Sequence, residues 1–133
     1  MSSFDPEHRV REDVLREWHP AEFGVPREKV GDEVIPIDKQ EAIHLTAEIY
    51  DEAWDYLYPE KDVPGWQNTL YVYDEDRGIY RPRGGNQIRQ QSESILGKYA
   101  DNNFINELES KLKRRNKVDS WDMGDSRPAP HRI

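Results

Sequence analysis

The sequence predicts an α+β fold that is mainly helical: two N-terminal helices, a β-hairpin, then a helix-turn-helix-like pair in a winged-helix-like order. Three observations predict it. Apolar residues recur at helical spacing in separate segments of the 133-residue chain. A glycine-containing acidic turn lies between two short alternating stretches, which is typical of a hairpin. The last two helical segments are separated by only a few polar residues.

The first predicted helix follows Asp5-Pro6, because Asp is a favourable N-cap and Pro suits the first helical position. Its apolar face is formed by Val10, Val14, Leu15 and Trp18. His19-Pro20 ends it. Residues 19–37 contain several Gly and Pro residues and are expected to be irregular, with a short strand near 33–37.

The second predicted helix begins after Asp38, which has capping-box spacing to Glu41. We expect it to continue to about Tyr58. Its apolar stripe, predicted to face the core, is formed by Ala42, Leu45, Ile49, Ala53, Trp54 and Leu57.

The predicted hairpin pairs residues 70–73 with 79–81. Gly78 supplies the positive φ angle that the acidic turn requires. Pro82 cannot donate a backbone hydrogen bond, so the second strand is expected at the edge of the sheet.

The predicted helix-turn-helix pair begins with Asn86 as N-cap of a helix over 87–99. A turn over 100–103 leads to a helix over about 103–116. The apolar residues of the pair are Ile88, Ile95, Leu96, Tyr99, Phe104, Ile105, Leu108 and Leu112. Five basic residues crowd the end of the second helix, more than the helix macrodipole alone explains.

These elements predict three regions. Residues 1–40 form an N-terminal helix and irregular arm, and residues 41–119 form the folded domain of helix, hairpin and two helices. Residues 120–133 form a flexible, Pro-rich tail.

Charge is distributed unevenly along the chain. The net charge is −8 overall, but residues 1–69 carry net −10 and residues 77–117 carry net +6. A local basic segment in an acidic chain is typical of a polyanion partner, although a solvated face of mixed charge is the common alternative. The acidic, Arg-rich composition resembles that of salt-adapted proteins. With no cysteine, no signal peptide and no apolar run of membrane-spanning length, we expect a cytoplasmic protein.

Catalytic motifs are missing from the sequence. The Gly97-Lys98 pair lacks the rest of a phosphate-binding loop, so ATP hydrolysis by this chain alone is not expected. Glu41, His44 and Glu48 share a helix face, but carboxylate-bridged metal sites need ligands from several helices. We therefore predict no catalytic residue, no metal and no cofactor, and favour binding or assembly.

Residues 70–119 contain, in order, an aromatic strand, an acidic turn with Gly, an aromatic-x-Pro stretch, a helix, a polar turn and a basic-ended helix. The residues concerned are Tyr71, Tyr73, Gly78, Tyr80, Pro82, Ile88, Leu96, Asn106, Glu107, Arg114, Arg115 and Val118. In this order the segment resembles the N-terminal-like domain of the phage and plasmid primase–helicases, relatives of the poxvirus helicase-primase. The resemblance covers about 70–133, with a vaguer match over 41–57.

The resemblance implies a role in the replication of viral, plasmid or integrated DNA. The domain would act as a collar or accessory unit before a superfamily 3 helicase motor, guiding DNA or assembling subunits. The motor's Walker residues, a primase site and the family's following Asn-Gly-hydrophobic-Leu-Asp-Leu stretch are missing. We expect a fragment or truncated relative of an ATP-dependent helicase, non-catalytic by itself.

Non-specific contact with the DNA backbone is the binding mode we expect, because no residue pattern argues for base readout. The predicted contact residues are Lys111, Lys113, Arg114, Arg115 and Lys117, with a second line at Arg81, Arg83 and Arg89.

Two alternatives remain open. One is a stand-alone, dimeric helix-turn-helix regulator with 103–116 as recognition helix and the hairpin as wing. The other is an interaction module whose basic segment meets an acidic partner, such as residues 1–69 of another copy, giving self-association.

Overall fold

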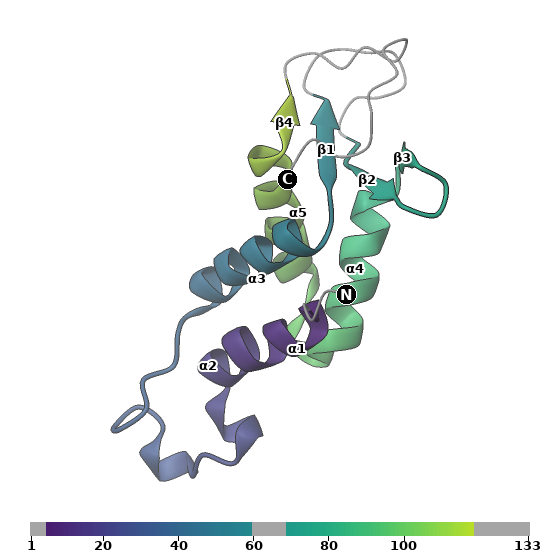
Figure 1. Cartoon of the computed structure of the whole chain (residues 1–133). Coiled ribbons are helices and arrows are strands. Elements are labelled where there is room, and N and C mark those ends of the chain that lie inside the picture. The colour runs from purple at the N-terminus through teal and green to yellow at the C-terminus, as the bar shows by residue number, and fades with distance from the viewer. Residues whose placement is uncertain (1–4, 60–68, 119–133) are drawn as a thin grey trace.

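Helices form most of the described chain, and a small four-stranded sheet lies at one end of them (Figure 1). This computed structural model describes residues 5–59 and 69–118. The mainly helical α+β prediction is confirmed. The tail predicted over 120–133 lies outside the described residues.

The N-terminal helix runs through α1 (Pro6–Val10), a π-helical segment (Arg11–Leu15) and α2 (Arg16–Trp18). Asp5 caps it as predicted, and its carboxylate accepts hydrogen bonds from the N–H groups of Glu7 and His8. Two short 3₁₀ turns follow, at Pro20–Phe23 and Arg27–Lys29. The strand expected near 33–37 is wrong, because that segment makes only an isolated bridge between Val30 and Val34.

Helix α3 (Lys39–Ala53) begins as predicted, with the Asp38 carboxylate accepting from the N–H of Glu41 at 2.8 Å. Its predicted end at Tyr58 is wrong. The backbone becomes extended at Trp54, and β1 (Tyr56–Pro59) follows. Tyr56 and Leu57 are both buried in this strand, because β1 lies between two other strands.

The hairpin consists of β2 (Tyr71–Asp74) and β3 (Ile79–Arg81). The strand order is β3-β2-β1-β4, which confirms β3 at an edge of the sheet. Gly78 has the expected positive φ, 69°. Since β2 also pairs with β1, the hairpin extends a sheet and is not an isolated wing.

Helix α4 runs from Gly84 to Leu96, earlier than the predicted start after Asn86. Gly84 approaches β2 closely, because its N–H donates to the carbonyl of Leu70 at 2.9 Å. A Cβ at Gly84 would lie only 2.6 Å from that carbonyl oxygen. Packing against the strand, not a side-chain cap, therefore sets the start of the helix.

Helix α5 (Asn102–Arg115) follows a 3₁₀ turn (Gly97–Tyr99), and β4 (Lys117–Val118) comes directly after it. The Asp101 carboxylate caps α5 through the N–H of Phe104 and also binds the ammonium group of Lys39 at 3.1 Å. The starts of α3 and α5 are thus tied together. Strand β4, which the sequence did not reveal, pairs in parallel with β1.

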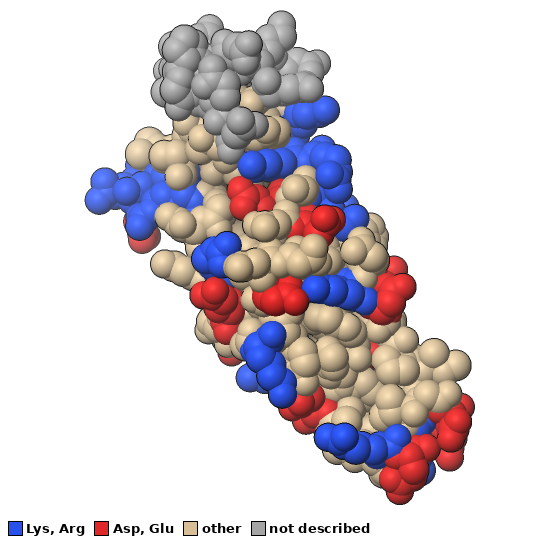
Figure 2. All heavy atoms as spheres, turned by 180° about the vertical axis from the view of Figure 1, so that it is seen from behind, with Lys and Arg blue, Asp and Glu red and all other residues tan. Residues whose placement is uncertain are grey.

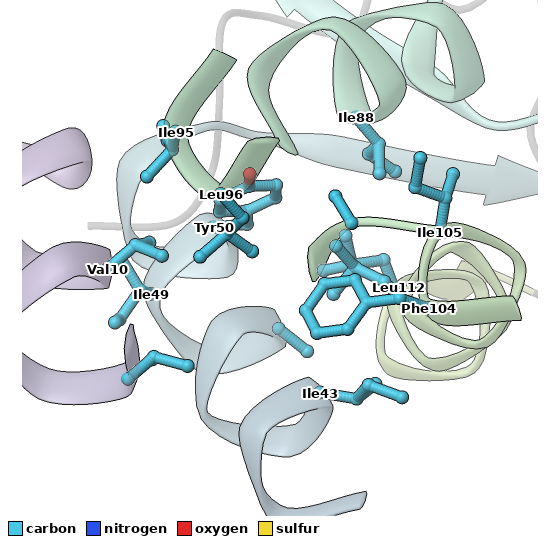
Figure 3. Close-up of a cluster of buried hydrophobic side chains, with 14 of the residues drawn as sticks. Val10, Ile43, Ile49, Tyr50, Ile88, Ile95, Leu96, Phe104, Ile105 and Leu112 are labelled. Carbon is cyan, nitrogen blue, oxygen red and sulfur yellow. The ribbon is translucent and has the colours of Figure 1, made fainter. Parts of the chain in front are cut away.

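The core lies where α1, α3, α4 and α5 meet (Figure 3). Val10, Tyr50, Ile95 and Phe104, one from each helix, are almost fully buried there. The hydroxyl groups of Tyr50 and Ser92 lie 3.0 Å apart inside this core and satisfy each other. Burial raises the pKa of Tyr50 to about 12, so its hydroxyl keeps its proton.

Candidate binding surfaces

Metal chemistry finds no support in the part of the chain that the structure describes, where no group of three His, Asp or Glu residues could hold an ion. His44 and Glu48, suggested by spacing alone, lie on the exposed side of α3 with Nε2 and a carboxylate oxygen 3.3 Å apart. None of the described helices is long and apolar enough to cross a membrane.

The predicted DNA-binding residues do not form one surface. Figure 2 shows Lys and Arg side chains on both flanks of the end that carries the sheet, with carboxylates among them and towards the opposite end. One group belongs to α5 and β4, and the other to the hairpin and the start of α4.

The first group surrounds a hollow of about 200 Å³ between α3 and α5. We call it the basic hollow, and its lining residues are His44, Ala47, Lys111, Arg114 and Arg115. Residues 111, 114 and 115 are three and four positions apart, so one face of α5 presents all three cations.

These three cations differ in their ion pairs with described residues. Arg115 donates to Asp51 of α3 at 3.1 Å, and the Asp51 carboxylate also accepts from the buried Asn116 amide. This network holds the end of α5 against α3. Lys111 and Arg114 make no ion pair with another described residue.

The remaining basic residues of this group lie elsewhere. Lys113 points to another side of α5, where it pairs with Glu109 at 3.3 Å and lies over the ring of Tyr58. Lys117 is exposed on β4, beside Tyr58 of β1.

Two residues of the second group, Arg81 and Arg83, line an open groove of about 590 Å³, which we call the polar groove. Its α4 side presents a row of side-chain amides, from Asn86, Gln87, Gln90 and Gln91. The facing side comes from the hairpin, and Trp54 and Asp55 after α3 complete the lining. Two stretches of the chain therefore build it: residues 53–55, and residues 72–91, which run from the hairpin into α4.

Two predicted arginines lie in this groove. Arg81 on β3 pairs with Asp74 on β2 at 3.2 Å, whereas Arg83 at the start of α4 is exposed without an ion pair to any described carboxylate. Partial burial raises the pKa of Asp74, but hydrogen bonds from the Arg81 side chain and from two turn N–H groups outweigh it. The pKa of Asp74 is therefore lower than usual.

Carboxylates outnumber arginines in the polar groove. Asp55, Asp74, Glu75 and Asp76 line it together with Arg81 and Arg83, so the described residues of the lining carry a net charge of −2. Arg89, the last predicted contact residue, lies outside this lining and binds Asn102 at 3.2 Å and Glu93 at 3.6 Å.

The groove amides were missed by sequence reasoning. They look like ordinary exposed helix residues, and their common role emerges only when the hairpin and Trp54 are placed opposite them. A usable signal was their spacing, since positions 86, 87, 90 and 91 share one helix face.

Comparison with known proteins finds no matching family model, no matching curated protein and no matching solved structure. Functional inference therefore depends on the residues and surfaces described above.

Proposed function

We propose that this chain is a non-catalytic DNA-binding accessory unit that contacts the phosphate backbone through the basic hollow. The resemblance of residues 70–133 to the primase–helicase accessory domain supports placing it in a DNA replication assembly. In that setting it would contribute DNA contact and subunit assembly to a helicase motor on another part of the protein or another chain.

The basic hollow carries the proposal. Lys111 and Arg114 extend from one face of α5 beside a concave space, with no ion-pair partner among the described residues. Exposed cations of this kind bind phosphate oxygens and release counterions from DNA, which favours binding most at low salt. Arg115 is anchored on Asp51 and supports the position of its neighbours.

A salt titration of duplex DNA binding tests this proposal. We expect the affinity of the chain for a mixed-sequence duplex to fall steeply as salt rises. Replacing Lys111 and Arg114 by Ala should reduce the slope of log K against log salt by about two units, since each phosphate contact contributes about 0.9. Fluorescence anisotropy with a labelled duplex measures both the affinity and its dependence on salt.

The matched control is Arg27→Ala with Lys29→Ala. It removes the same charges from an exposed 3₁₀ turn in the N-terminal loop and should leave the slope nearly unchanged. Absence of binding at low salt, or an identical slope in the Lys111/Arg114 variant, would refute backbone binding at the hollow. Arg81, Arg83, Arg89, Lys113 and Lys117 stay predicted contacts, to be tested singly in the same assay.

A helix-turn-helix regulator is the second candidate, and the start of α5 favours it. Asn103 and Asn106 are exposed in the first half of the helix, where recognition helices present side chains to base edges. This function requires one duplex sequence to bind far more tightly than a scrambled one, and Asn106→Ala to reduce that preference. Equal affinity for unrelated duplexes would exclude it.

A further inference from the structure

We propose that the polar groove binds an extended peptide segment that carries Lys or Arg side chains. The proposal concerns a different surface from the basic hollow and does not depend on DNA binding. It follows from the amide row, the charge of the lining and the position of the aromatic residues.

The amide row matches the repeat of an extended peptide. Asn86 and Gln90 are four residues apart on α4, which separates them by about 6 Å along the helix. An extended chain repeats its backbone groups on one side every two residues, about 6.7 Å. Each side-chain amide offers one acceptor and two donors, which complement the C=O and N–H groups of a peptide.

Charge selects a basic peptide. Arg81 is paired with Asp74, which leaves Glu75 and Asp76 as the other carboxylates of the hairpin rim, with the exposed Arg83 at the start of α4. Both carboxylates are exposed and neither pairs with a described cation. A Lys or Arg of the ligand would bind these carboxylates through charge-assisted hydrogen bonds, while a polyanion such as DNA would meet a net negative lining.

The aromatic residues suit the aliphatic part of such a side chain. Trp54 is half-buried in the groove and is held edge-on against Tyr50, with ring centroids 5.2 Å apart. Tyr73, on the hairpin side, packs in the same manner against Tyr80. A lysine stem can lie on these fixed rings while its ammonium group reaches the rim.

A linear polyamine is a poorer fit. Its ammonium groups only donate hydrogen bonds, so they would leave the NH₂ groups of the amide row without an acceptor. A peptide can pair with both the C=O and the NH₂ group of the exposed amides of Asn86 and Gln90, whereas the Gln87 oxygen already accepts from the Tyr56 hydroxyl.

The test uses nuclear magnetic resonance of the ¹⁵N-labelled full chain. The probe is a short capped peptide of alternating Lys and Ser, added near neutral pH in about 0.15 M salt, where diffuse surface attraction is screened. We expect shifts of the side-chain amide signals of Asn86 and Gln90 and of the Trp54 indole. A peptide of alternating Glu and Ser should produce none.

Variants test which carboxylates bind the basic side chains of the peptide. Glu75→Gln with Asp76→Asn should weaken binding of the Lys peptide about five- to tenfold, and Gln90→Ala about threefold. Glu28→Gln with Asp32→Asn removes the same charges from the exposed N-terminal loop and should have no effect. The Lys111/Arg114 double Ala variant should bind the peptide normally, which separates this proposal from DNA binding.

Several outcomes would overturn the proposal: groove signals that do not move, affinity that the Glu75/Asp76 variant leaves unchanged, or spermidine binding as tightly as the peptide. Shifts spread over all acidic faces would show surface attraction only. Single-stranded DNA moving the groove signals when the Lys peptide does not would assign the groove to nucleic acid.

Discussion

The basic hollow and the polar groove differ in how their charges are supplied. In the hollow, one face of α5 presents three cations, and among the described residues only Arg115 of the three has an ion-pair partner. In the groove, the hairpin pairs Arg81 with Asp74 and adds further carboxylates, so the described lining is negative although Arg83 has no ion pair with a described carboxylate. An arginine-rich sequence therefore does not define an anion site. The nearest carboxylates, often distant in sequence, decide whether an arginine is available to a ligand.

Gly84→Ala should give the largest loss of stability of the variants considered, and it should disturb the packing beside the polar groove. The new Cβ would lie 2.6 Å from the Leu70 carbonyl oxygen and 2.7 Å from its side chain, so α4 and β2 must separate. We expect a loss of about 3 kcal/mol in the free energy of unfolding, measured by urea denaturation. Gly85→Ala is the control, because its Cβ would meet only the movable end of Glu109. Equal stability of the two variants would contradict the close packing.

Asn116→Ala should weaken the packing of α5 against α3 beside the basic hollow. The buried Asn116 amide donates to Asp51 at 3.0 Å and to the Leu112 carbonyl at 2.8 Å, joining the end of α5 to α3. We expect a loss of about 2 kcal/mol, together with a weaker DNA affinity as Arg115 loses its support. Asn103→Ala, at an exposed position of the same helix, should change stability little. A stable Asn116 variant would show that the network does not hold the hollow.

Tyr56→Phe tests the hydrogen bond between Tyr56 of β1 and Gln87, one of the groove amides on α4. The buried Tyr56 hydroxyl donates to Gln87 Oε1 at 2.6 Å, which orients that amide in the groove. Its removal should cost about 1 kcal/mol and reduce affinity for the Lys peptide without altering DNA binding. Tyr73→Phe removes one hydroxyl from the neighbouring strand and is the stability control. A loss of DNA affinity would mean that the two surfaces are not independent.

Lowering the pH should destabilise the contact between α3 and α5, the two helices that line the basic hollow, because Asp101 becomes protonated. The Phe104 N–H and the Lys39 ammonium group hold the pKa of Asp101 below its usual 3.8 in the folded chain. The stabilisation is therefore complete above pH 3.8 and is lost as pH falls through the lower folded value. Asp101→Asn should flatten this part of the curve of unfolding free energy against pH, whereas Asp32→Asn should not. An unchanged curve would contradict the role of Asp101.

Local sequence signals predicted much of the helical framework. Asp5 and Asp38 cap their helices as expected, because an N-cap depends only on neighbouring N–H groups. Gly78 likewise marks the hairpin turn. The strands β1 and β4 were missed because their pairing links residues far apart, and Tyr56 and Leu57 also fit an apolar helix stripe. The start of α4 was misplaced because it depends on contact with Leu70.

For the two candidate sites as well, local spacing could be predicted from the sequence, and contacts between distant residues could not. The basic hollow was partly visible, since residues 111, 114 and 115 fall on one helix face by spacing alone. Their pairing with Asp51 depends on how α3 packs and could not be inferred. For the polar groove, the sequence shows only that the amides at 86, 87, 90 and 91 share one helix face. That the hairpin and Trp54 lie opposite them depends on the fold and could not be inferred.

The parallel pairing of β1 with β4 has a practical consequence for attaching labels. Pro59 lies directly beside Val118, so the two positions are neighbours at one end of the sheet. A fluorophore attached at position 59 and an acceptor attached at position 118 would report a short distance only while the strands stay joined. Their energy transfer would follow the opening of the sheet during unfolding, separately from the helical core.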